Sequence, residues 1–182
     1  TVSIVANPGT TQLAPLGSTQ HHASEHLYLA SEIGQNFTIN RINLSMANNG
    51  DGPAPDTYNN VTIYLAYTAL TAFTTGTFST VGYTPVYTGP IAWTANGYAG
   101  VYLTTPFPYA MASGNLKMMI VRADGVLHTP LPTFDSARGS AAPGTATTTT
   151  SRRFNGAAAP TGASSLAASA FRAKVQFIND PN

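Results

Sequence analysis

The chain has 182 residues, of which 8% are charged and 43% are hydrophobic, and its formal net charge is +1 at pH 7. This length suits one domain, residues 1–182, with a sizeable core. A nearly neutral chain has no field that attracts nucleic acid, and no apolar run approaches the roughly 20 residues that span a bilayer. We therefore expect neither nucleic-acid binding nor membrane insertion.

The surface of such a chain must consist mainly of Thr, Ser, Asn, Gln and Gly. A surface of hydroxyl and amide groups repels copies of itself only weakly, which favours self-association or a location outside the cell. The chain has no cysteine and therefore neither a disulfide framework nor thiolate chemistry.

The first seven residues, TVSIVAN, open with an apolar strand pattern formed by Val2, Ile4 and Val5. Residues 1–7 either pair at the edge of their own sheet or detach and complete the sheet of a neighbouring copy. The start at Thr1, without an initiator Met, fits a mature exported chain whose leader has been removed or an artificially shortened chain.

Three histidines and one carboxylate lie close together, at His21, His22, His26 and Glu25. Imidazole and carboxylate groups can bind zinc or copper, but this spacing matches no established metal motif. We therefore expect a solvated loop without a metal, leading into a weak strand at residues 27–29.

Alternation of apolar and polar residues dominates the chain, as in antiparallel strands with one buried face. The segment 36–46 alternates but slips at Asn40–Arg41, which indicates a β-bulge. Further strong strands are expected at 60–68, 115–123 and 171–178, and weaker ones at 2–5, 86–93 and 100–103. Eight or more short strands predict an all-β fold, a single antiparallel β-sandwich of jelly-roll type.

The turn at residues 48–56, NNGDGPAPD, connects two of these strands. Its prolines and glycines predict a hairpin turn. Asp51 and Asp56 could also hold a calcium ion, although the alternating acidic ligands of a known calcium loop are missing. The sequence leaves this question open.

Aromatic residues gather in the stretch 83–109, which contains Tyr83, Tyr87, Trp93, Tyr98, Tyr102 and Tyr109. In β proteins such residues pack in the core or across strands. The other interpretation is a strip that stacks sugar rings, formed by Tyr87, Trp93, Tyr98 and Tyr102. In "PFPY", residues 106–109, Phe107 and Tyr109 are expected to drop into the sheet interface.

Residues 125–162 are rich in Thr, Ala, Pro, Gly and Ser, which fits a disordered linker or a long surface loop. The strong strand that follows favours a surface loop before the last strand, anchored by Phe134 and Phe154. The Ala-rich segment 164–170 is also expected to be loop. The seven acidic residues sit mostly in predicted turns, and no nucleophile elbow or phosphate loop is present. We therefore expect no catalytic residues, no metal and no cofactor.

The order of several motifs resembles a β-sandwich module of secreted, surface-exposed proteins of Bacteroidetes, over roughly residues 26–178. The matching positions are Tyr28, Glu32, Tyr87, Gly89, Leu103, Pro106, Phe107, Tyr109, Asn115 and Leu116. Two positions depart from the family pattern: Ala110 replaces an acidic residue, and Tyr98 stands where Trp is usual. The C-terminal sorting domain typical of such proteins is not part of the sequence.

These observations predict a non-enzymatic extracellular or cell-surface protein. The leading hypothesis is a structural subunit that associates with copies of itself in a filament, sheath or array. The alternative is a carbohydrate-binding or adhesive module that recognises a polysaccharide.

Overall fold

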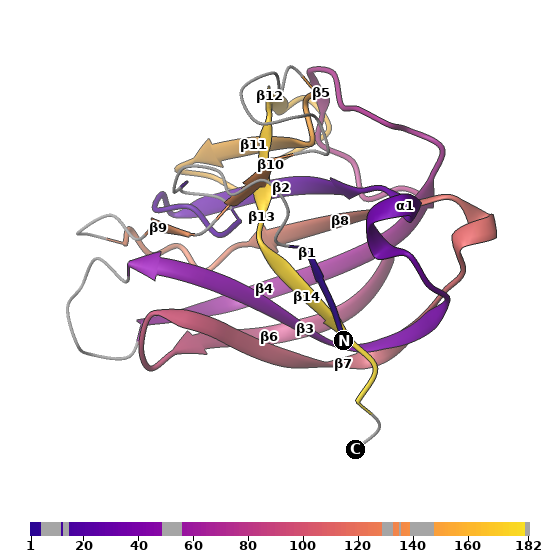
Figure 1. The fold of residues 1–182 in the computed structure, drawn as a ribbon. Coiled ribbons are helices and arrows are strands. Elements are labelled where there is room, and N and C mark those ends of the chain that lie inside the picture. The colour runs from indigo at the N-terminus through magenta and orange to yellow at the C-terminus, as the bar shows by residue number, and fades with distance from the viewer. Residues whose placement is uncertain are drawn as a thin grey trace.

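The computed structural model describes residues 1–4, 12, 15–48, 56–128, 133–134, 136–138 and 148–180. These residues form an all-β protein of antiparallel sheets, two of which lie face to face as in a β-sandwich (Figure 1). Helical structure in the described residues is confined to α1 (Ala30–Ile33) and the 3-10 turn η1 (Met111–Ser113). The predicted fold class, all-β with antiparallel sheets, is thus confirmed.

The smaller sheet has the strand order β1-β14-β3-β7, with β9 also paired to β3. Its strands are β1 (Val2–Ile4), β14 (Val175–Ile178), β3 (Phe37–Asn48), β7 (Gly97–Tyr109) and β9 (Thr133–Phe134).

The larger sheet has the order β5-β12-β11-β2-β8-β4-β6. Its strands are β5 (Gly76–Thr77), β12 (Ser165–Ser169), β11 (Ser151–Gly156), β2 (His21–Tyr28), β8 (Asn115–Arg122), β4 (Asp56–Thr68) and β6 (Thr84–Trp93). A separate pair joins β10 (Ser136–Arg138) to β13 (Phe171–Ala173).

Eight strands pair in a nested order, the first of them with the last. β1 pairs with β14, β2 with β8, β3 with β7, and β4 with β6. Along the chain these strands alternate between the two sheets, except that β4 and β6 both lie in the larger one. The chain ends of the described part meet, since indigo β1 and yellow β14 run side by side (Figure 1).

The core fills the space between the two sheets, because the alternating apolar residues of facing strands point into it. The predicted strong strands supply most of it: Ile42, Leu44 and Met46 of β3; Val61, Ile63 and Leu65 of β4; Leu116, Met118 and Ile120 of β8; Val175 and Phe177 of β14. The predicted bulge is also present, because the register between β3 and β7 shifts between Ile39 and Arg41.

The N-terminal segment lies at the edge of its own sheet, with Val2 opposite Phe177 and Ile4 opposite Val175. This is the first of the two predicted arrangements. Val5, Ala6 and Asn7 lie outside the described residues, as does Asp51.

Two loop predictions are wrong, and a third is not confirmed over its whole length. Residues 21–28 form β2, a strand buried on both faces, and residues 165–169 form β12. The predicted loop at 125–162 contains β9, β10 and β11, and β11 lies between β2 and β12 inside the larger sheet. β2 and β11 escape the alternation pattern because they carry polar side chains that find partners within the protein, such as His22 with Asn155 and Glu25 with Arg152.

Candidate functional sites

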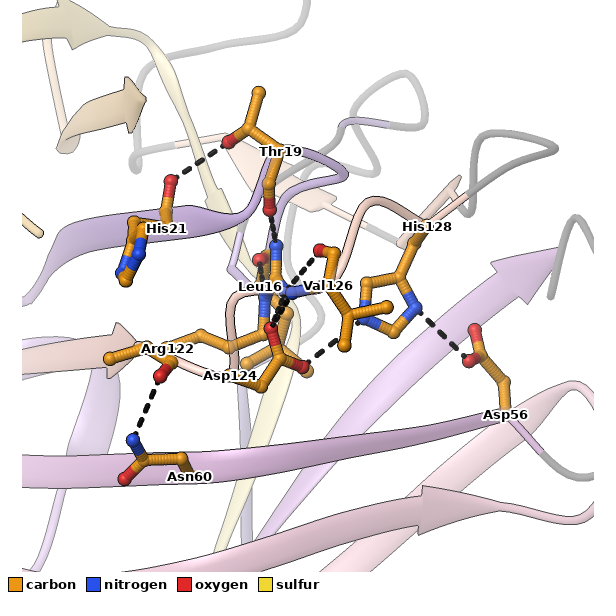
Figure 2. Close-up of polar contacts among 10 residues, drawn as sticks. Leu16, Thr19, His21, Asp56, Asn60, Arg122, Asp124, Val126 and His128 are labelled. Carbon is orange, nitrogen blue, oxygen red and sulfur yellow. Dashed lines mark hydrogen bonds and ion pairs between the residues drawn. The ribbon is translucent and has the colours of Figure 1, made fainter. Parts of the chain in front are cut away.

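A buried chain of ionisable groups links the end of β8 to the start of β4 (Figure 2). Arg122, the last residue of β8, donates through Nε to the Leu16 carbonyl at 2.8 Å and through Nη2 to the Thr19 carbonyl. Its Nη1 pairs with Asp124 Oδ1. The guanidinium thereby ties the segment before β2 to the end of β8, and burial lowers the pKa of Arg122.

His128 continues this chain of groups between two carboxylates. Its Nε2 lies 3.3 Å from Asp124 Oδ2, and its Nδ1 lies 3.5 Å from Asp56 Oδ1. The imidazole also stacks on the Tyr58 ring, with centroids 4.2 Å apart. Asp56, which the sequence suggested as a calcium ligand, is thus engaged by a buried histidine at the first residue of β4.

This network has the composition of a catalytic site but not its accessibility. Asp56, Arg122 and His128 are all buried, and both ring nitrogens of His128 face carboxylates. A general base must reach a substrate proton within hydrogen-bond distance. Within the described ranges no group of three or more His, Cys, Asp or Glu residues is arranged to hold a metal ion. We interpret the network as a clamp that holds the segment after β8 against β4.

Two of the three histidines of β2 lie inside the protein rather than in solvent. His22 and His26 are fully buried, and burial lowers the pKa of each to about 3. Glu25 lies between them in the strand and so faces the opposite side of the larger sheet. The predicted cluster of three histidines and a carboxylate is therefore divided between two faces of one strand.

The hydrogen bonds of His26 define its tautomer. Its Nδ1 accepts the backbone N–H of Ala173 at 3.0 Å, so the proton sits on Nε2, which donates to Ser24 Oγ at 2.8 Å. The Ser24 hydroxyl then donates to the Pro15 carbonyl at 2.9 Å. A histidine in this tautomer cannot take the serine proton, so the pair is structural and not a nucleophile with its base.

The opposite side of β2 is covered by the segment between β4 and β6. Tyr83 donates through its hydroxyl to Glu25 Oε1 at 2.6 Å, and Arg152 of β11 pairs with Glu25 Oε2. Lys117 lies 4.2 Å from the Tyr83 ring centroid, and Arg152 lies 4.9 Å from that of Phe73. The pKa of Tyr83 is raised mainly by burial and, to a smaller extent, by the negative charge of Glu25.

A second buried ion pair joins α1 to β13. Arg172 contacts Glu32 through two nitrogens, at 2.8 and 2.5 Å, and also donates to the Leu27 carbonyl. Its guanidinium lies over the Tyr28 ring at 4.8 Å. Tyr28 and Glu32, two positions of the sequence motif, thus meet at one arginine.

The prediction that Trp93 stacks sugar rings is wrong, because this residue is 1% exposed and packs edge-on against Tyr58 and Phe134. Its indole N–H donates to the Gly97 carbonyl at 3.1 Å. Tyr87 of β6 is half-buried, and its hydroxyl donates to Pro90 at 2.6 Å. Trp93 is a core residue, as the competing interpretation expected for the aromatic stretch.

The other two aromatics, Tyr98 and Tyr102, are 39% and 41% exposed and lie on the outer side of β7. We define the tyrosine face by a set of residues that point outward from the smaller sheet or lie beside it: Ser3, Arg41, Asn43, Tyr98, Gly100, Tyr102, Lys174 and Gln176. An amide ladder crosses this face, since Asn43 donates to Gln176 at 2.8 Å and Gln176 donates to Ser3 at 3.2 Å.

Cations and one carboxylate border the two rings. The Arg41 guanidinium lies 5.0 Å from the Tyr102 centroid, and Lys174 Nζ lies 5.7 Å from that of Tyr98. The Tyr102 hydroxyl donates to Asp180 at 3.0 Å, and Arg41 is 3.9 Å from the same carboxylate. The face thus offers aromatic rings, amides and charged groups toward solvent.

Sequence reasoning missed Arg122 and Arg172. The signal for Arg122 was present, because it continues the inward phase of Leu116, Met118 and Ile120. Arg172 gave no such signal, because alternation along 171–178 places its side chain on the outer side. The strand is interrupted at Lys174, between β13 and β14, and the Arg172 side chain is buried instead.

The fold and these sites define an all-β protein with closed polar networks inside and one open aromatic face. Comparison with known proteins found no matching family model, curated protein or solved structure. No helix in the described ranges is long and apolar enough to cross a membrane.

Proposed function

We propose that this protein is a non-enzymatic extracellular binding protein that attaches to polysaccharide through the tyrosine face. The observation that carries the proposal is the exposed pair Tyr98 and Tyr102 on one side of β7, beside a row of amide groups. Aromatic rings offer flat apolar surfaces to the C–H faces of sugars, and amides exchange hydrogen bonds with hydroxyl groups.

The proposed architecture is a jelly roll. Eight strands in two Greek keys characterise this fold, and the nested pairs β1–β14, β2–β8, β3–β7 and β4–β6 support it. β11, β12 and β5 then extend the larger sheet beyond β2. The sequence resemblance to surface-exposed modules of Bacteroidetes agrees with an adhesive role outside the cell.

A non-enzymatic role is favoured because the buried ionisable groups face one another. Glu25, Glu32 and Asp124 each contact an arginine. Carboxylates held in this way are poor general acids or bases, since their hydrogen-bonding capacity is directed at protein groups.

The test is binding of the protein to a panel of insoluble and soluble polysaccharides, measured by pull-down and affinity electrophoresis. We expect binding by the wild type and at least about tenfold weaker binding by Tyr98→Ala and Tyr102→Ala. Val81→Ala is the matched control, because Val81 is exposed but lies outside the tyrosine face. A wild type that binds no polysaccharide would refute the proposal.

Self-association is a second candidate, favoured by the position of β1, which is the edge strand of the smaller sheet among the described residues. The edge strands β6 and β7 carry Pro85, Pro90, Pro106 and Pro108, which hinder pairing with another chain. β1 has no proline and pairs with β14 over three residues, so a copy of this strand could replace it.

The test of self-association is removal of residues 1–7, followed by negative-stain microscopy and sedimentation. We expect the wild type to form ordered polymers and the shortened chain to remain monomeric, with Val81→Ala behaving as wild type. Polymers that form unchanged without residues 1–7 would rule out strand exchange.

A further inference from the structure

The centre of the tyrosine face is a glycine between two tyrosines. Gly100 lies on the same side of β7 as Tyr98 and Tyr102, and opposite Asn43 of β3. A Cβ at position 100 would collide with Asn43 Oδ1 and would lie only 2.7 Å from Arg41 Nε. The absence of a side chain here lets the Asn43 amide and the Arg41 guanidinium lie between the two rings.

Two polar atoms in this gap have no hydrogen-bond partner within the described part of the chain. They are Asn43 Oδ1, an acceptor, and Arg41 Nε, a donor, and both are shielded from solvent. Asn43 as a residue is only 8% exposed, and its amide nitrogen is already engaged by Gln176. A buried polar group without a partner costs about 1–3 kcal/mol, so a ligand group that pairs with these two atoms gains binding free energy.

Arg41 can move away from this position. Its side chain is 32% exposed, and its ion pair with Asp180 spans 3.9 Å, with a carboxylate side chain that is 47% exposed. Such a surface pair contributes little, at most about 1 kcal/mol. A ligand that lifts the guanidinium would gain access to Asn43 Oδ1 and to the face of Tyr102 that Arg41 covers.

The unpaired atoms specify the chemistry of that ligand. Once the guanidinium has moved aside, a hydroxyl group can donate to Asn43 Oδ1 and accept from the displaced Arg41 Nε–H, so one group pairs with both atoms. A carboxylate or phosphate only accepts and would leave Asn43 Oδ1 unpaired. The Cα atoms of Tyr98 and Tyr102 are about 13 Å apart along the strand, at 3.3 Å per residue, which suits an extended chain lying along β7.

We propose that Gly100, Asn43 and Arg41 form a hydroxyl-binding subsite that takes one residue of a neutral polysaccharide, with Arg41 as a displaceable cover. The flanking tyrosines stack the sugars on either side. This inference rests on the proposed function and adds the sugar class and the residues that select it.

The experiment measures binding of wild type and variants to neutral glucan, mannan and xylan and to the uronate polymer alginate by affinity electrophoresis. Gly100→Ala fills the gap at a position whose backbone φ is not in the left-handed region. We expect it to weaken neutral-polysaccharide binding about tenfold or more. The unfolding temperature should fall, because Asn43 and Arg41 must shift to admit the methyl group, but unfolding should stay cooperative. Gly162→Ala, at an open position, is the matched control and should bind as wild type.

A second variant, Asn43→Asp, keeps the side-chain size and gives Arg41 a permanent partner, so it should also weaken binding. It tests the subsite independently if Gly100→Ala fails to fold. Wild-type binding that is lost in Tyr98→Ala but kept in both subsite variants would overturn the subsite and leave the proposed function standing. Stronger binding to alginate than to the neutral polymers would overturn the sugar class. Failure of the wild type to bind any polymer would overturn the proposed function itself.

Discussion

Two regions of this protein use the same polar side chains in opposite ways. Around β2, the closed region, Glu25 is paired with Tyr83 and Arg152 beneath the segment between β4 and β6. On the tyrosine face, the open region, Arg41 and Asp180 are only loosely paired and partly exposed. Both regions contain tyrosine, arginine and a carboxylate, and they differ in what covers them.

The difference shows where the protein can bind a ligand. In the closed region each charge is compensated by a protein group, so the polar groups contribute to stability and are unavailable to solutes. In the open region the weak pair contributes little stability, and its groups can exchange partners. Substitutions should therefore affect stability in the closed region and binding in the open one.

The largest expected effect is the pH dependence of stability caused by His22 and His26. Burial lowers their pKa values from 6.5 to about 3, so the unfolded chain binds up to two more protons between these limits. Their contribution is complete above pH 6.5 and is lost as the pH falls toward 3, by about 3 kcal/mol per pH unit at most for the two together. Urea unfolding from pH 7 to 4 measures this slope.

The slope should be roughly halved in His22→Asn, since only His26 would then take up a proton. Equal stability of the wild type at pH 7 and pH 4.5 would show that these histidines are not buried as neutral groups.

The next largest effect is the loss in free energy of unfolding when one carboxylate is removed from each region. Glu25→Ala leaves Arg152 without its buried partner and should lower the free energy of unfolding by about 3 kcal/mol. Asp180→Ala should lower it by less than about 1 kcal/mol, because its pair with Arg41 is solvated. Chemical unfolding of the two variants compares them directly, and similar losses would contradict the division into closed and open regions.

A smaller effect is expected from removing one hydroxyl in each region. Tyr83→Phe leaves Glu25 with one donor fewer in a buried site and should cost about 1–2 kcal/mol. Tyr102→Phe removes a hydroxyl that donates to the exposed Asp180 and should cost less than about 0.5 kcal/mol. Thermal unfolding by circular dichroism ranks the two, and the reverse ranking would refute the assignment.

The smallest effect concerns Trp93, the only tryptophan of the chain. Because its indole is buried in the core, saturating polysaccharide should leave its fluorescence emission maximum unchanged, whereas denaturant should shift it to longer wavelength. A ligand-induced shift in the folded protein would mean that the ligand binds near the core aromatics rather than on the tyrosine face.

The fold was predictable where apolar residues alternate. The strands at 36–46, 60–68 and 115–123 and the bulge near Asn40 follow from that pattern. β2 and β11 were not predictable in this way, because His22 and Glu25 occupy buried positions and Arg152 a half-buried one, whereas pattern rules place such residues in solvent. Only their partners, which come from distant parts of the chain, make that burial favourable.

The candidate site was predictable in part. Sequence reasoning included Tyr98 and Tyr102 among the stacking aromatics, but it also included Trp93, which the structure places in the core. Spacing could not separate these residues, since all three lie in strands and only the direction of each side chain relative to the sheets distinguishes them. Arg41 and Asn43 were not considered, because their relation to Gly100 exists only through the pairing of β3 with β7.

The sequence by itself determined the all-β antiparallel class and most core strands of this protein, because alternation is a local property of each segment. Tertiary structure decided which charges are enclosed and which aromatic rings face solvent. The physical reason is that desolvating a charge or a ring depends on the groups packed against it, and those groups come from strands far away in the chain.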